Sequence, residues 1–155
     1  MNAVVLTISD TRTEETDASG DLLVGLLSEF GASVVKTIVR DDEDEIRNAL
    51  IEYCDSGQID LIITTGGTGF APRDVTPEAT HAVIEKEAPG IAEAMRRESA
   101  VHTPTAMIAR GVCGIRGSTL IINFPGSPKG VSECFEVVRP VLIHAVRLIG
   151  GKTDH

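Results

Sequence analysis

Short apolar runs alternate along this chain with segments whose apolar residues recur at helical spacing. Runs rich in β-branched residues are typical of strands buried on both faces of a parallel sheet. They lie at residues 3–8, 33–39, 59–63 and 118–124, with shorter strands expected at 105–109 and 112–115. The alternation predicts an α/β fold. In this three-layer α/β/α sandwich, helices cover both faces of a mostly parallel central sheet.

Helices are expected between these strands because their segments have one apolar face. Ser19 and Thr76 are interpreted as the N-caps of two helices, with Pro77 at the first helical position of the second. An acidic run at 41–45 precedes a helix that ends at Gly57, and further helices are expected at 91–99, 128–138 and 140–149. The last two are separated at Pro140, which has no N–H for the helix ladder.

The length and composition predict one domain over residues 1–155, with a mass of 16.4 kDa. Aromatic residues make up only 3% of the chain, so the core must consist of Val, Ile, Leu and Ala. Cys54, Cys113 and Cys134 lack metal-ligand spacing and are expected to be reduced, mostly buried thiols. The first residues form no basic leader, and no apolar run is of membrane-spanning length, so we expect a soluble, cytoplasmic protein without a membrane partner.

The formal net charge is −9, from 14 basic and 23 acidic residues. Such a surface repels a nucleic-acid backbone, whose binding depends on Lys and Arg, so nucleic acid is not an expected partner. The same charge opposes a free nucleotide. A nucleotide site therefore requires local compensation from loop N–H groups, Mg²⁺ or single cations such as Arg73.

A glycine-rich loop of Gly66, Gly67, Thr68 and Gly69 follows the strand at 59–63. In open parallel sheets, ligands bind at the carboxyl edge of the strands. Glycines allow successive N–H groups to turn toward one point and surround an anion, which makes phosphate the natural ligand. A loop of this composition also occurs as a simple turn, and this one has neither the P-loop spacing nor the full dinucleotide fingerprint.

Two aspartates follow predicted strands near this loop. Asp74 comes just after the glycines, and Asp41 follows the strand at 33–39. A carboxylate beside a phosphate loop repels the ligand unless a cation bridges them, and Mg²⁺ is the hard cation that joins carboxylates to phosphate oxygens. If the two strands lie near each other, Asp41 and Asp74 form a two-carboxylate cation site. The remaining acids of the 41–45 run are explained by the helix dipole alone.

Polar groups also end the first and last long strands, at Ser9–Asp10 and at Gly126–Ser127. Ser127 followed by Pro128 predicts a helix start whose free N–H groups bind an anion, although a cap without a ligand explains the pattern equally well. Arg96 and Arg97 are interpreted as a solvated helix face. His144 is expected to be packed within its helix, and the histidines show no pattern of a general base.

These motifs, in this order, resemble those of the molybdopterin-binding family, whose best-known branch is molybdopterin adenylyltransferase. The resemblance rests on Thr64–Gly69, on Arg73–Ala79 and on Leu120–Ser127, with Ser9–Asp10, Ser19–Gly20, Asp41 and Gly114–Gly117 between and before them. It covers nearly the whole chain and is especially close to the amino-terminal domain of gephyrin.

The resemblance implies a homotrimer that takes part in molybdenum cofactor biosynthesis. In that reaction the terminal phosphate of molybdopterin attacks the α-phosphate of ATP with Mg²⁺ present, and pyrophosphate leaves. Asp41 and Asp74 are carried over as catalytic residues that hold Mg²⁺. The residues carried over for binding of molybdopterin and ATP are Ser9, Asp10, Ser19, Gly20, Gly66, Gly67, Thr68, Gly69, Gly126 and Ser127. A metal-insertion protein is a possible downstream partner.

This sequence departs from its relatives at a few positions. Arg40 and Asp42 flank Asp41 where relatives often have Pro and Glu, and Ala109 stands where several relatives have a Ser hydroxyl. Neither departure touches the two aspartates. A non-catalytic carrier or assembly scaffold for molybdopterin is the alternative to the enzyme, since fold similarity alone does not distinguish them. The retained aspartates favour the enzyme.

Overall fold

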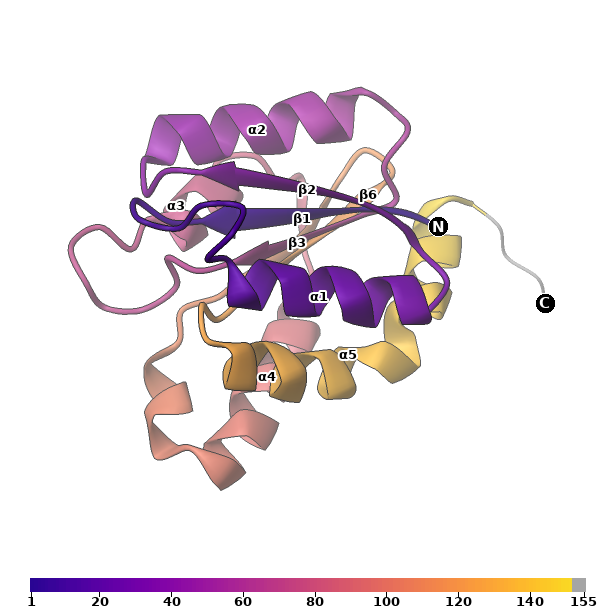
Figure 1. Cartoon of the computed structure of the whole chain (residues 1–155). Helices are drawn as coiled ribbons and strands as arrows, with labels where there is room; N and C mark the ends of the chain where they lie inside the picture. The colour runs from indigo at the N-terminus through magenta and orange to yellow at the C-terminus, as the bar shows by residue number, and fades with distance from the viewer. Residues whose placement is uncertain (152–155) are drawn as a thin grey trace.

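The computed structural model describes residues 1–151, within which six strands form one sheet covered by helices on both faces (Figure 1). The strands are β1 (Asn2–Ile8), β2 (Ser33–Val39), β3 (Leu61–Thr65), β4 (Lys86–Glu87), β5 (Cys113–Arg116) and β6 (Thr119–Phe124). Their order in the sheet is β2-β1-β3-β6-β5-β4. The first four are parallel, and β5 and β4 are antiparallel to their neighbours. This confirms the expected three-layer α/β fold with a mostly parallel sheet.

The helices divide between the two faces of the sheet. They are α1 (Ala18–Glu29), α2 (Glu43–Asp55), α3 (Thr76–His81), α4 (Pro89–His102), the 3₁₀-helix η1 (Pro104–Ile108) and α5 (Pro128–Ile149). Side chains of α1, α4 and α5 pack in one apolar cluster, and those of α2 and α3 pack in the other (Figure 1). Among residues 1–151, no helix combines the length and the apolarity needed to cross a membrane.

The central strands are buried on both faces, as their continuous apolar runs predict. In β3, Leu61 and Ile63 belong to the cluster with α1, α4 and α5, whereas Ile62 belongs to the cluster with α2 and α3. All three side chains are fully buried. The alternation follows from the two-residue period of a strand, so each central strand joins the two halves of the core.

The register brings the carboxyl ends of the parallel strands to one edge. Ile8 pairs with Val39, Thr7 with Thr65, and Thr65 with Phe124. From β1 the chain first moves to one side as β2 and later returns to the other side as β3. This reversal leaves a crevice beyond the strand ends, which is where ligands bind in open α/β sheets.

The N-cap predictions for two helices were wrong. Asp17, not Ser19, caps α1, because its side chain accepts a hydrogen bond from the Gly20 backbone N–H. Val75 occupies the N-cap position of α3 without a side-chain hydrogen bond, and Thr76 is already helical. In both cases the hydroxyl donates to a distant carbonyl instead: Ser19 to Gly126 and Thr76 to Gly66.

Two element predictions and one burial prediction were also wrong. Residues 105–109 form no strand, because Pro104 starts the 3₁₀-helix η1 directly after α4. Residues 128–149 form one helix, α5, although Pro140 lies inside it. Buried residues before and after Pro140, including Phe135 and Leu142, hold the helix against the core through the proline. His144 is exposed on this helix and is not packed.

Candidate active site

The glycine loop after β3 has a conformation that side chains oppose. Gly66 and Gly67 have φ values of +105° and +65°, which L-residues rarely adopt. A Cβ on Gly67 would lie 2.4 Å from the Thr76 hydroxyl oxygen and 3.3 Å from Asp41 Oδ1. The loop therefore needs glycine here both for its backbone angles and for the close approach of α3 and Asp41.

Asp41 and Asp74 lie on the two sides of this loop. The Asp41 carboxylate approaches Gly67, and Asp74 Oδ2 lies 2.8 Å from the position of a Cβ on Gly69. Asp74 Oδ2 also accepts a hydrogen bond of 2.9 Å from the Ala71 backbone N–H. Strands β2 and β3 flank β1 instead of pairing with each other, yet the structure brings the two aspartates to one short loop.

Asp10 joins the loops that follow β1 and β2. Its backbone N–H donates to Asp41 Oδ2 at 2.9 Å, and its own Oδ1 accepts from the Asp41 backbone N–H at 3.1 Å. Arg73 forms an ion pair with the same Asp10 carboxylate from the glycine-loop side. Asp10 therefore connects the Asp41 loop to the segment that carries Asp74.

The electrostatics of the crevice favour a cation beside Asp41. Burial raises the pKa of Asp41 above its ordinary value, and repulsion from Asp10 and Asp74 acts in the same direction. By contrast, hydrogen bonds from Arg73 lower the pKa of Asp10. A divalent cation would offset the repulsion between the Asp41 and Asp74 carboxylates.

The donor set at this position fits a hard cation held partly by substrate. Within residues 1–151, no group of three or more His, Cys, Asp or Glu side chains is arranged to hold a metal ion. Asp41 and Asp74 supply carboxylate oxygens only, the ligand type that Mg²⁺ prefers. Mg²⁺ is usually held by one or two carboxylates together with phosphate and water oxygens. Two aspartates leave the other coordination positions to such oxygens.

The Ser9 hydroxyl stabilises the loop after β1, and the Ser19 hydroxyl joins α1 to the turn at Gly126. Ser9 Oγ accepts hydrogen bonds from the backbone N–H groups of Thr11 and Arg12 at 3.2 and 3.0 Å. The buried Ser19 hydroxyl donates to the Gly126 carbonyl oxygen at 2.8 Å. Gly20 is buried against Asp17, where a Cβ would lie 2.1 Å from a carboxylate oxygen. These three positions therefore build the site scaffold.

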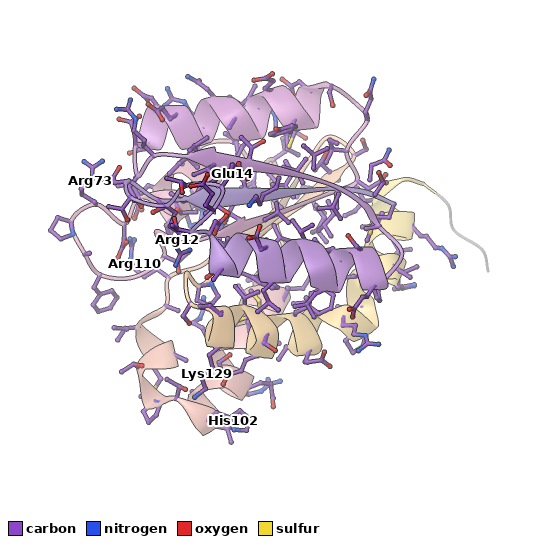
Figure 2. All side chains as sticks on the ribbon, viewed as in Figure 1. Arg12, Glu14, Arg73, His102, Arg110 and Lys129 are labelled. Carbon is purple, nitrogen blue, oxygen red and sulfur yellow. The ribbon has the colours of Figure 1, made fainter. Side chains whose placement is uncertain are left out.

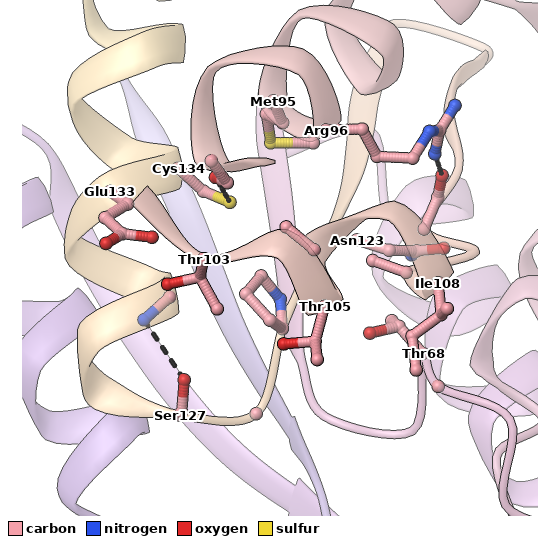
Figure 3. Close-up of a pocket in the computed structure, with 18 of the residues that line it drawn as sticks. Thr68, Met95, Arg96, Thr103, Thr105, Ile108, Asn123, Ser127, Glu133 and Cys134 are labelled. Carbon is pink, nitrogen blue, oxygen red and sulfur yellow. Dashed lines mark hydrogen bonds between the residues drawn. The ribbon is translucent and has the colours of Figure 1, made fainter. Parts of the chain in front are cut away.

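A cavity of about 440 Å³ opens beside the glycine loop (Figure 3). Thr68, Gly69 and Asp74 line one side, and Gly126 and Ser127 line another. The remaining wall comes from α4, η1 and the first turns of α5, and includes Met95, Thr105, Ile108 and Ala109. The size and the mixture of apolar walls with a few polar groups are those of a small-molecule site.

The first turn of α5 lines this cavity. Ser127 is the N-cap, as predicted, and its Oγ accepts from the Gly130 backbone N–H at 3.1 Å (Figure 3). Lys129 also lines the cavity. The structure thus brings together the glycine loop, Asp74 and the Gly126–Ser127 turn around one cavity, and Asp41 approaches the same loop at Gly67 without lining the cavity.

Several residues of the site were not singled out from the sequence. Arg12 Nη2 donates to the Gly126 carbonyl oxygen at 2.6 Å, and its Nη1 lies 3.7 Å from the buried Asp17. Arg96, expected on a solvated face, lines the cavity and donates to the Gly111 carbonyl oxygen (Figure 3). Arg110 contacts the glycine loop, and with Arg12 and Arg73 it lies near the carboxyl edge of the sheet (Figure 2). The sequence offered a signal only for Asp17, a capping residue two positions before Ser19.

Comparison with protein families matches residues 4–144 to the family described as "Probable molybdopterin binding domain". The chain belongs to this family. It is 45% identical over 152 residues to the molybdopterin adenylyltransferase of Helicobacter pylori, which covers 95% of this chain and 86% of the relative. These matches confirm the resemblance that the motifs indicated.

Two further comparisons agree with membership of the molybdopterin-binding family. The chain is 49% identical over 150 residues to the molybdenum cofactor synthesis protein cinnamon of Drosophila melanogaster, covering 94% of this chain but only 25% of that protein. The crystal structure of the molybdopterin biosynthesis enzyme MoaB from Thermus thermophilus has a TM-score of 0.89 at 43% identity, covering 97% of each chain. The fold and the family are therefore the same.

Proposed function

We propose that this chain is a molybdopterin adenylyltransferase of molybdenum cofactor biosynthesis. The observation that carries the proposal is the approach of Asp41 to Gly67 and of Asp74 to Gly69, in one glycine loop that borders a small-molecule cavity. The 45% identity to a molybdopterin adenylyltransferase over most of both chains supports the same activity.

In the proposed reaction, an oxygen of the terminal phosphate of molybdopterin forms a bond to the α-phosphorus of ATP. The bond from that phosphorus to the bridging oxygen of the β-phosphate breaks, and pyrophosphate leaves with the electron pair. Such a transfer needs positioning and charge neutralisation more than a covalent nucleophile. The proposed mechanism uses no histidine as a general base.

The residues of the crevice have separate proposed roles. Asp41 and Asp74 hold Mg²⁺, which would neutralise the phosphate charge when bound. Backbone N–H groups of Gly67, Thr68 and Gly69 orient the phosphates. The Gly66 N–H donates to the Phe124 carbonyl oxygen at 3.3 Å and so fixes the start of the loop. The Gly126–Ser127 turn and the N-terminus of α5 bind an anionic group at the other side of the cavity, because N–H groups at a helix start favour negative charge.

Four further residues are proposed to position the groups that bind the ligands: Ser9, Asp10, Ser19 and Gly20. Asp10 holds Asp41 by two backbone–side chain hydrogen bonds, and Ser19 holds the Gly126 carbonyl. Their hydrogen bonds keep the β1 and β2 loops and the α5 turn at fixed separations around the substrates. Preorganisation of this kind lowers the cost of reaching the reactive geometry.

A non-catalytic carrier or scaffold for molybdopterin is the competing function. A carrier needs the cavity but has no use for two carboxylates beside the glycine loop, where they repel an anionic ligand. The discriminating property is nucleotide binding: the enzyme binds ATP in a Mg²⁺-dependent manner, and a carrier does not.

Incubation of the purified protein with molybdopterin and Mg²⁺-ATP tests the proposal, with the adenylylated pterin followed by mass spectrometry. We expect adenylyl-molybdopterin and pyrophosphate to form in equal amounts and both to be absent with EDTA. Binding of molybdopterin without any modification, with the protein folded and Mg²⁺ in excess, would replace the enzyme with the carrier.

We also propose that residues 1–155 act as a single domain that forms a cytoplasmic homotrimer and passes its product to a metal-insertion protein. The exposed apolar side chains of Val101 and Met107, 75% and 71% exposed, support an assembly that covers the end of α4 and η1. Size-exclusion chromatography with light scattering should give three times the chain mass. A monomer at micromolar concentration would contradict the trimer.

A further inference from the structure

The side chain of Arg110 connects the two ends of the segment that carries Asp74. Arg110 lies just after η1, and its Nε donates to the Gly69 carbonyl oxygen at 2.8 Å. Its Nη2 donates to the Asp74 carbonyl oxygen at 2.7 Å. Its backbone N–H donates to the Thr68 carbonyl oxygen at 2.8 Å. One residue therefore bonds to the backbone where the segment begins and where it ends.

Glu78 fixes the orientation of this guanidinium. Arg110 Nη1 donates to Glu78 Oε1, and Nη2 lies 3.4 Å from Glu78 Oε2. The Arg110 guanidinium also lowers the pKa of Glu78, so the carboxylate is charged at neutral pH. Glu78 belongs to α3, whose Thr76 hydroxyl donates to the Gly66 carbonyl oxygen. The ion pair therefore joins the loop to a helix that is itself bonded to the loop.

Other bonds to Asp74 lie within the segment itself: the Ala71 N–H donates to Asp74 Oδ2 and the Asp74 N–H donates to the Ala71 carbonyl oxygen, each at 2.9 Å. They shape the segment but do not join it to the rest of the chain. Phe70 at its tip is 68% exposed, and residues 71–73 are also exposed. Arg73 forms an ion pair with Asp10, but its side chain is 64% exposed, and surface pairs of this kind contribute little. Arg110 is less exposed, at 34% of its side chain, and its planar fork places three donors in fixed directions. Of the two arginines, Arg110 is the one that bonds to the backbone at both Gly69 and Asp74.

We propose that Arg110 is a positioning residue that sets the place of the Asp74 carboxylate opposite Asp41 and so determines the affinity of the metal site. This inference rests on the proposed function for the identity of the metal. Ile108 and Ala109, which precede Arg110, line the cavity, so the same residue connects the cavity wall to the Asp74 segment. A Lys at this position keeps the charge, but its three donors share one nitrogen and cannot reproduce the spread of the guanidinium fork.

The test compares Arg110→Lys with a matched control, Arg116→Lys. Arg116 also makes a three-donor contact set, to both Asp55 carboxylate oxygens at 3.0 and 3.1 Å and to the Val83 carbonyl oxygen. It lies beside Thr119 at the start of β6, away from the carboxyl edge. The control therefore reports the general cost of losing an arginine fork.

Binding of Mn²⁺, a paramagnetic substitute for Mg²⁺, is measured for each protein by electron spin resonance. We expect Arg110→Lys to weaken Mn²⁺ binding about 10- to 100-fold, as for the loss of groups that orient metal ligands. Molybdopterin affinity should stay within about twofold, and hydrogen exchange should accelerate only in residues 69–75. Arg116→Lys should leave all three measurements unchanged. If Arg110→Lys does not fold, Glu78→Gln takes its place with the same expectation.

Equal Mn²⁺ affinity in wild type and Arg110→Lys would overturn the inference, and so would an equal loss in Arg116→Lys. A wild-type protein that binds Mn²⁺ but forms no adenylyl-molybdopterin would reject the proposed function alone. In that case a weaker Mn²⁺ affinity in Arg110→Lys would still support the positioning role. A wild-type protein that binds no Mn²⁺ either alone or with molybdopterin present would overturn both.

Discussion

Gly67 is the residue whose substitution most directly tests the loop geometry. Its φ is +65°, and a Cβ would meet the Thr76 hydroxyl oxygen at 2.4 Å. Gly57 provides a matched control, because its φ is +67° and nothing lies within 4 Å of the corresponding Cβ position. The pair separates the cost of the backbone angle from the cost of the collision.

We expect Gly57→Ala to lower the free energy of unfolding by about 1–2 kcal/mol, the cost of a left-handed conformation. Gly67→Ala should lower it by about 1–3 kcal/mol more, because the added methyl group is also overpacked. Urea unfolding followed by circular dichroism measures both. Equal losses in the two variants would show that the loop has room for a side chain.

The three cysteines test the burial of the core at single residues. Burial raises the pKa of Cys54 and of Cys134 to about 11 and the pKa of Cys113 to about 12. Because only the thiolate reacts with alkylating agents, a raised pKa lowers the reactive fraction: at pH 8 it is roughly one in a thousand for Cys54 and Cys134 and roughly one in ten thousand for Cys113.

We therefore expect no cysteine adduct with iodoacetamide at pH 8 in the time that a free thiol reacts completely. The rate should increase with pH, and all three thiols should react once urea unfolds the chain. Mass spectrometry of the intact protein counts the adducts. A rapid single adduct on the native protein would show that one thiol is accessible.

The placement of individual residues was predictable where it depended on position after a strand. Asp41 and Asp74 were singled out because acids that follow strands at a parallel sheet edge indicate a ligand site, and the structure brings both to the glycine loop. Arg110 was not found, because its contacts lie 32–41 residues away along the chain. Such contacts form only after folding, and the spacing of residues along the chain does not predict them.

At the scale of single elements, α5 shows how packing overrides a local signal. Pro140 lacks the N–H that would bond to the Glu136 carbonyl, and the sequence therefore predicted two helices. Pro140 lies on the exposed face, so water can reach that carbonyl, while Val138 and Leu142 remain buried beside it. The helix continues because its apolar face is covered on both sides of the proline.

Replacement of Pro140 by Ala should therefore stabilise the protein by about 1–3 kcal/mol, since it restores the missing hydrogen bond in a helix that already forms. Ser132→Ala, also exposed on α5, is the control and should change stability by a few tenths of a kcal/mol. Thermal unfolding measures both. A loss of stability in Pro140→Ala would indicate that α5 packs only in a bent form.

The long buried strands were the best predicted elements, because their runs of β-branched residues fit only positions covered on both faces. Residues 105–109 also contain apolar residues but lie outside the sheet, in and just after η1 on the cavity wall. β4, a strand of two exposed residues, has no apolar pattern to identify it. Short segments of this kind take their structure from neighbours.

At the scale of the whole molecule, the sheet order creates the site. The ends of β1, β2, β3 and β6 lie side by side at one edge, so loops from distant parts of the sequence meet there. The chain carries a net charge of −9, but Arg12, Arg73 and Arg110 lie around this edge (Figure 2). Each of these arginines is paired with a carboxylate, of Asp17, Asp10 and Glu78 respectively. Loop N–H groups and a bound cation are therefore needed to oppose the repulsion of an anionic substrate.

The measurement that tests the central claim most directly compares turnover and molybdopterin binding in Asp74→Asn. Asn keeps the shape of the side chain but removes the charge that holds Mg²⁺. We expect turnover to fall about 100-fold or more while molybdopterin affinity is retained, and Asp44→Asn, an exposed change on α2, to alter neither. Unchanged turnover in Asp74→Asn would contradict a two-aspartate magnesium site at this loop.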